Sequence, residues 1–128
     1  MKFMIMFVDD EMAMARLPAA ELARIVREKE TIGQELWRQG KHVASQRLWP
    51  SATATRVSRR NGKVMASDGP FTETKEVLLG FHLVECASRE EALEWAEKFL
   101  VFESATVEVR PVWERCLCHG SFDCSSRV

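Results

Sequence analysis

Apolar residues alternate on both sides of the first predicted strand, residues 2–8, "KFMIMFV". One side carries Phe3, Ile5 and Phe7, and the other carries Met4, Met6 and Val8. A strand that is apolar on both faces is normally covered on both faces in the folded protein. Its short length and the acids that follow it favour a strand over a signal peptide.

Helical spacing replaces this alternation after an acidic loop. Pro18 is suited to the first turn of a helix. Apolar residues then recur three or four positions apart, at Leu22, Ile25, Val26, Ile32, Leu36 and Trp37. Gly40 is placed to end this helix, and residues 42–49, "HVASQRLW", predict a strand closed by Pro50.

The second half of the chain predicts a hairpin, a long strand, a helix and a last strand. Asn61-Gly62, between residues 53–58 and 63–67, is a strong signal for a tight hairpin turn. Residues 77–86 form the long strand, Ser88 and Glu91 make a capping box for a helix, and residues 105–113 form the last strand. This order predicts an α+β fold of the ferredoxin-like type with an extra β-hairpin and both helices on one face of an antiparallel sheet.

Two helices cover only one face of such a sheet, so the face with Met4 and Met6 needs another cover. A second copy of the same sheet is the simplest one, which predicts a homodimer with its sheets face to face. The alternative is a monomer whose hairpin and C-terminal tail fold over that face.

Composition excludes several classes of protein. The 128 residues are 46% hydrophobic and 29% charged, with a net charge of −1. This suits one globular domain, without attraction to nucleic acid or to an anionic membrane. No apolar run approaches the ~20 residues of a membrane span. Four cysteines without an export signal favour a cytoplasmic protein with reduced thiols.

Several separated motifs occur together: "ATATRV", "DGPFTETKE", Gly80-Phe81, "EALEWAEK" and "VEVRPVWE". With these motifs the chain closely resembles the YCII-related family, in its DGPF subgroup, over residues 1–114, with residues 115–128 as a tail outside the pattern. The resemblance implies a bacterial dimeric α+β barrel with a pocket in or beside it. The family is largely of unknown function, and some members are linked to extracytoplasmic-function sigma factors. The wider fold includes lactone isomerases, a dehalogenase and monooxygenases, so it does not fix a reaction. Founding members carry a histidine on the first helix, whereas the corresponding segment here, residues 25–37, has none.

Three residues are the candidate catalytic groups: His82, Asp68 and Arg110. If Phe81 and Leu83 lie under the helices, His82 points into the dimer cleft, where it can transfer protons near neutral pH; the alternative is a structural histidine. Asp68, before Gly69, suits either a turn or a general base. Arg110 needs a carboxylate partner, from Asp68 or Glu73, or else an anionic ligand.

Three more residues are candidates for ligand binding. Phe71 either plugs the barrel edge or lines the pocket. Glu73 and Lys75 share one face of an extended segment, as a solvated edge or as ligand contacts. Arg56, Arg59 and Arg60 on the hairpin are expected to be a solvated edge.

The tail contains groups of the kind that bind zinc: Cys116, Cys118, His119 and Cys124. Their spacing lacks the usual C-x₂-C pair, so a flexible polar tail is the preferred interpretation. Cys86 is expected to be buried and inert. No phosphate-binding loop, nucleophile elbow or strong metal motif indicates a nucleotide or a required cofactor.

Two functions are consistent with these features. The first is a small-molecule-binding dimeric α+β barrel that transfers a proton on a carbonyl or lactone compound. The second is a non-catalytic accessory or regulatory protein, linked to a sigma factor. Clustering of His82, Asp68 and Arg110 in one cavity would favour the first.

Overall fold

The protein is described by a computed structural model, which covers residues 1–69 and 75–113. The elements follow the order β1 (Lys2–Asp10), α1 (Glu11–Ala15), α2 (Ala19–Arg38), β2 (His42–Arg47), the 3₁₀ turn η1 (Ser51–Thr53), β3 (Thr55–Arg60), β4 (Lys63–Asp68), β5 (Glu76–Glu85), α3 (Arg89–Lys98) and β6 (Val107–Pro111). This is the predicted order, with α1 and η1 added.

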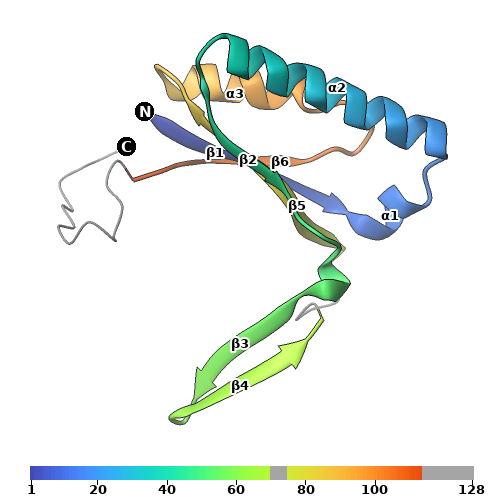
Figure 1. Ribbon diagram of the computed structural model, residues 1–128, viewed down its shortest axis with the longest axis vertical. Helices are drawn as coiled ribbons and strands as arrows, with labels where there is room; N and C mark the ends of the chain where they lie inside the picture. Colours follow the sequence, from blue (N-terminus) through green and yellow to red (C-terminus); the bar gives the residue numbers. More distant parts are fainter. Residues whose placement is uncertain (70–74, 114–128) are drawn as a thin grey trace.

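Four strands form one antiparallel sheet in the order β2-β5-β1-β6. Helices α2 and α3 lie on the same side of it (Figure 1). The arrangement is compatible with the ferredoxin-like plan and confirms the predicted α+β class. No helix in the described part of the chain is long and apolar enough to cross a membrane.

The core lies between this sheet and the helices. Strand β1 alternates between buried and half-buried residues along its whole length, and its buried side carries Phe3, Ile5 and Phe7. These side chains contact Leu36, Val84, Cys86, Ala92, Trp95, Ala96 and Phe99. Each large side chain buried in this way contributes about 1.5–3 kcal/mol.

The other side of the four-stranded sheet, which we call the open face, has no helix over it. It carries Met4 and Met6 from β1, and cross-strand pairing puts Leu83 opposite Met4 and Phe81 opposite Met6. The prediction that the helices leave the Met4 and Met6 side uncovered is therefore confirmed.

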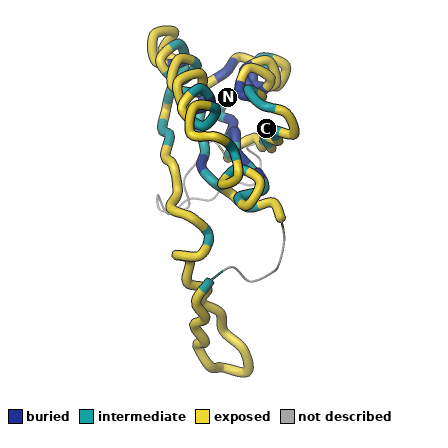
Figure 2. Tube along the Cα trace, turned by 90° about the vertical axis from the view of Figure 1, so that its right-hand side faces the viewer, coloured by how far each residue is buried: buried dark blue, intermediate teal, exposed yellow. Residues whose placement is uncertain are grey.

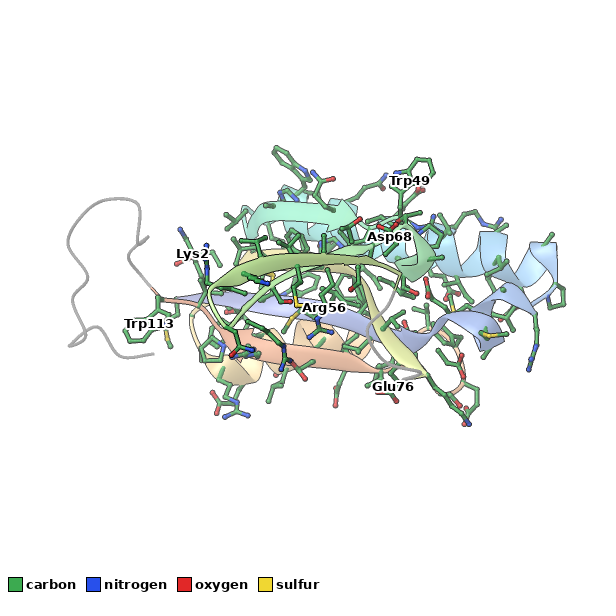
Figure 3. All side chains as sticks on the ribbon, turned by 90° about the horizontal axis from the view of Figure 1, so that it is seen from below. Lys2, Trp49, Arg56, Asp68, Glu76 and Trp113 are labelled. Atoms are coloured by element: carbon green, nitrogen blue, oxygen red, sulfur yellow. The ribbon has the colours of Figure 1, made fainter. Side chains whose placement is uncertain are left out.

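Strands β3 and β4 form a separate two-stranded hairpin. Its turn is the predicted one, with Asn61 at φ 50° and Gly62 at φ 75°, conformations that Asn and Gly tolerate. Every residue of both strands is exposed, and the hairpin extends away from the rest of the domain (Figure 2). It lies on the side of the sheet opposite the helices: it stands apart from the open face in Figure 1 and crosses in front of the sheet in the view of Figure 3. The alternative of a monomer whose hairpin and tail fold over this face is therefore not supported for the hairpin, and the tail lies outside the described residues.

Local capping explains the ends of the helices. Ser88 accepts a hydrogen bond from the Glu91 backbone N–H at the start of α3, as predicted, and the Glu91 carboxylate accepts one from Ala87. The acidic segment after β1 is not a loop but helix α1, because Asp10 caps it by accepting from the N–H groups of Met12 and Ala13.

Candidate ligand-binding pocket

A cavity of about 770 Å³ lies at the end of the sheet where β2 separates from β5. Its walls come from α1 and the residue after it, the first part of α2, the end of β2 and η1. The lining residues are Glu11, Met12, Met14, Ala15, Arg16, Leu22, Arg47, Leu48, Trp49, Pro50, Ser51, Ala52 and Leu79. Trp49, which projects from the molecule in Figure 3, is 82% exposed. The pocket is thus largely apolar, with a few polar groups.

Glu11 holds two walls of this pocket together. Its carboxylate accepts a hydrogen bond of 2.8 Å from the backbone N–H of Ser51 and a second from the Ser51 hydroxyl. This contact joins the start of α1 to the start of η1, across 40 positions of sequence. Because both carboxylate oxygens are occupied, Glu11 serves mainly to fix the shape of the pocket.

One cation lines the pocket and another lies close to it. Arg47 lines it from β2, and Lys29 of α2 is close enough for the Arg47 charge to lower the pKa of Lys29. Burial is the largest cause of that lowered pKa, whereas the nearby carboxylate of Asp9 opposes it. The Lys29 ammonium lies 4.3 Å from the centroid of the Phe7 ring, a cation–π contact.

His82 does not lie where the sequence analysis expected it. It pairs with Ile5 across the sheet and therefore points to the helix side. Its ring contacts Phe99 at 4.8 Å and Phe7 at 5.7 Å between centroids, and Gly33 of α2 leaves room for it. The expected position of His82 in the dimer cleft, with Phe81 under the helices, is wrong.

The environment of His82 is poor for a proton-transfer group. Burial lowers its pKa to about 4, and the charges of His42 and Lys29 add to this effect. Its Nδ1 atom is buried and has no hydrogen-bond partner among residues 1–69 and 75–113. At neutral pH it is therefore a neutral ring inside an aromatic cluster.

The other candidate catalytic residues lie elsewhere. Asp68 ends β4 at the base of the hairpin, is exposed, and accepts a hydrogen bond of 3.2 Å from Thr55; Gly69 beside it has a φ of 85°, as the turn interpretation requires. Arg110 pairs with Met4 across the sheet and so shares the open face. None of the three lines the pocket. Their catalytic roles stay predictions, but their positions do not support one common site.

The remaining candidates are the ligand-binding residues Phe71, Glu73 and Lys75 and the cysteines, and only some of them lie within the described residues. Lys75 is exposed just before β5 and does not line the pocket, while Phe71 and Glu73 lie outside the described residues. Cys86 is buried, as predicted, and burial raises the pKa of its thiol, which disfavours the reactive thiolate. The tail candidates Cys116, Cys118, His119 and Cys124 lie outside the described residues. Within the described part of the chain, no group of three or more metal-ligating side chains comes together.

Comparison with known proteins identifies the family. The family model for the YCII-related domain matches residues 1–115. The chain belongs to the YCII-related family. An uncharacterized protein of Rhizobium meliloti (strain 1021) is 33% identical over 114 residues, which cover 88% of this chain and 92% of the relative. Family membership as predicted from the motifs is therefore confirmed.

The pocket of this YCII-related protein was not predicted from its sequence. Most of its lining comes from residues 11–16 and 48–52. These short segments show no helical or strand periodicity, and residues 11–15, which form α1, had been interpreted as a loop. The one available signal was "RLWPS", residues 47–51, where a strand ends in an arginine, two large apolar residues and a turn. Leu48 and Trp49 are both exposed, and this segment contributes apolar surface to the wall of the pocket.

Proposed function

We propose that this YCII-related protein binds a small molecule in the pocket between α1, η1 and the end of β2. The observation that carries the proposal is the pocket itself: about 770 Å³, largely apolar, with Arg47 among its lining residues. Small-molecule sites typically enclose about 300–1,000 Å³ and combine apolar walls with a few oriented polar groups.

Binding is better supported than the expected proton transfer on a carbonyl or lactone compound. The described lining contains neither histidine nor cysteine, and its one carboxylate, Glu11, is bonded to Ser51. General acid–base catalysis needs a titratable group within hydrogen-bond reach of the substrate. A non-catalytic accessory role therefore suits the pocket better. The DGPF subgroup and the link to an extracytoplasmic-function sigma factor stay predictions based on the resemblance.

A neutral fluorescent probe tests pocket binding directly. We expect N-phenylnaphthylamine to bind the wild-type protein and Ala15→Trp to reduce that binding at least tenfold, because Ala15 lines the pocket and a tryptophan there fills it. Ala23→Trp is the matched control, since Ala23 is exposed on α2 and does not line the pocket. Equal loss in both variants, or no probe binding by the wild type, would refute the proposal.

We also propose that the protein is a homodimer that associates through the open face. Met4, Met6, Phe81 and Leu83 give this face an apolar centre that no helix covers. The hairpin stands on the same side and carries Val57 and Val64 together on one of its faces, each more than half exposed. A second copy would remove both surfaces from water and complete a dimeric α+β barrel.

Light scattering during gel filtration at micromolar concentration tests the dimer, which should have twice the chain mass. Met6→Glu should give a monomer, because a carboxylate without a partner would be buried between the sheets. The control is Leu93→Glu, which puts the same charge on exposed α3, away from the open face. A wild-type monomer, or a Met6→Glu dimer, would contradict this proposal.

A further inference from the structure

The charged groups around the pocket point to a class of ligand. Strands β2, β5 and β1 line up Arg47, Gly80 and Phe7 on one rung of the sheet, on its helix side. A Cβ on Gly80 would lie 2.7 Å from the backbone oxygen of Gln46 and 3.3 Å from the Arg47 Cα. Glycine at position 80 thus permits a close approach of β2, whose residue Arg47 lines the pocket.

Lys29 of α2 places a second positive charge over Phe7, a member of the same rung. Its ammonium lies over Phe7 at 4.3 Å and is 5.8 Å from the centroid of Phe102. No hydrogen bond or ion pair joins Lys29 or Arg47 to any residue that the structure describes. Lys29 is half-buried, whereas Arg47 is exposed. A half-buried ammonium without an ion pair is unfavourable, because it loses hydration and gains little counter-charge.

The acids nearby do not neutralise these two cations. Asp9, 4% exposed, accepts a hydrogen bond of 3.1 Å from the Thr106 backbone N–H and makes no ion pair with Lys29. Glu11 is occupied by Ser51, and Arg16 adds a further cation to the lining. The pocket therefore combines apolar walls with positive charge from Arg16 and Arg47, and Lys29 lies nearby.

We infer that the ligand is a small, largely apolar molecule with one anionic group, a carboxylate or a similar oxyanion, that Arg47 binds directly. Lys29 strengthens this binding through its charge, and the walls formed by Leu22, Leu48 and Trp49 cover the apolar part. An arginine fork suits the two oxygens of a carboxylate. This inference rests on the proposed function, because it names the ligand class of the same pocket.

A pair of probes separates the inference from the proposed function. Anilinonaphthalene sulfonate and N-phenylnaphthylamine share a ring system, and only the first carries a negative charge. We expect the sulfonate to bind the wild-type protein more tightly. Arg47→Gln should weaken sulfonate binding about ten- to hundredfold, as expected for loss of a charge-assisted hydrogen bond. The affinity of the same variant for the neutral probe should stay within about twofold of the wild-type affinity.

Further variants test the role of charge against that of shape. Arg47→Lys should keep part of the preference for the sulfonate, and Lys29→Gln should reduce it by a smaller factor than Arg47→Gln. The matched controls are Arg59→Gln on the hairpin and Arg27→Gln on the exposed side of α2. Neither control should change the affinity for either probe. Decanoate should compete with the sulfonate better than decanol does.

Each outcome has one meaning. Equal affinities for both probes, or equal effects of Arg47→Gln on both, would overturn the anionic-ligand inference while leaving the pocket as a binding site. Absence of binding by either probe, or binding that Ala15→Trp does not reduce, would overturn the proposed function itself.

Discussion

Replacement of His82 by phenylalanine should remove a pH-dependent loss of stability. The wild-type ring is buried against Phe7 and Phe99, and its folded pKa is about 4 instead of 6.5. Between these two values the unfolded chain binds a proton that the folded protein does not. The free energy of unfolding therefore rises with pH in this window and falls as the solution is acidified from about pH 6.5 to about pH 4.

The size of this effect follows from the pKa difference. Each pKa unit corresponds to about 1.4 kcal/mol, so the full difference, from 6.5 to about 4, amounts to about 3.5 kcal/mol. The ring is not completely enclosed, and allowance for solvent screening reduces this to about 2 kcal/mol. His82→Phe keeps an aromatic ring in the cluster and cannot be protonated, so it should lack this contribution.

Urea unfolding followed by tryptophan fluorescence measures the effect as a difference of differences. The free energy of unfolding of wild type and variant is measured at about pH 7 and about pH 4.5, and the change between the two pH values is compared. The titration of shared carboxylates and any packing change from the larger ring cancel in this comparison. The wild type should lose about 1–2 kcal/mol more than His82→Phe over this range. His42→Asn, the control on the neighbouring ring, should retain most of that loss. Equal losses in wild type and His82→Phe would refute this account of His82.

Three other predictions concern the construction of the domain and are tested by urea unfolding at neutral pH. Gly80→Ala should cost about 1–3 kcal/mol, because its Cβ would meet backbone of β2 at 2.7 Å; Gly33→Ala, whose Cβ meets only a side chain at 3.4 Å, should cost less. Glu11→Ala should cost about 1–3 kcal/mol and weaken neutral-probe binding, because Ser51 loses both contacts; unchanged probe affinity would contradict its structural role. Ser88→Ala should cost about 1 kcal/mol through loss of the α3 cap, and no change would mean that the cap is dispensable.

Local signals predicted most of the secondary structure and the environment of β1. The turn at Asn61-Gly62 and the cap at Ser88 depend on a few neighbouring residues, so the sequence contains all that they need. The two faces of β1 were also assigned correctly, because the residues on the helix side are larger aromatics and branched aliphatics.

The orientation of β5 was predicted wrongly for a physical reason. Phe81 and Leu83 look more like core residues than Gly80 and His82, so hydrophobicity alone assigns them to the helix side. The actual orientation is set by register, because the pairing of Ile5 with His82 fixes which residues share a face. A one-residue change of register reverses every side chain, and nothing local to the strand determines it.

The pocket depends on contacts that are even less local. Glu11 and Ser51, which are hydrogen-bonded, lie in segments far apart in the sequence. The same is true of Lys29 and Arg47, whose positive charges lie close enough to repel each other. Cationic residues without partners cannot be recognised from sequence, since every arginine has possible partners until the fold is known.

Association and ligand binding are therefore expected on opposite faces of one sheet. Met6 lies on the open face, whereas Arg47 and Leu79 line a pocket on the helix side. Because no open-face residue named here lines that pocket, the monomeric Met6→Glu variant should bind anilinonaphthalene sulfonate within about threefold of the wild type, and Arg47→Gln should remain dimeric. Loss of sulfonate binding in folded Met6→Glu, with helical circular dichroism unchanged, would mean that the second copy contributes to the pocket. The two functions would then not be separable, and the pocket of a single chain would be only part of the binding site.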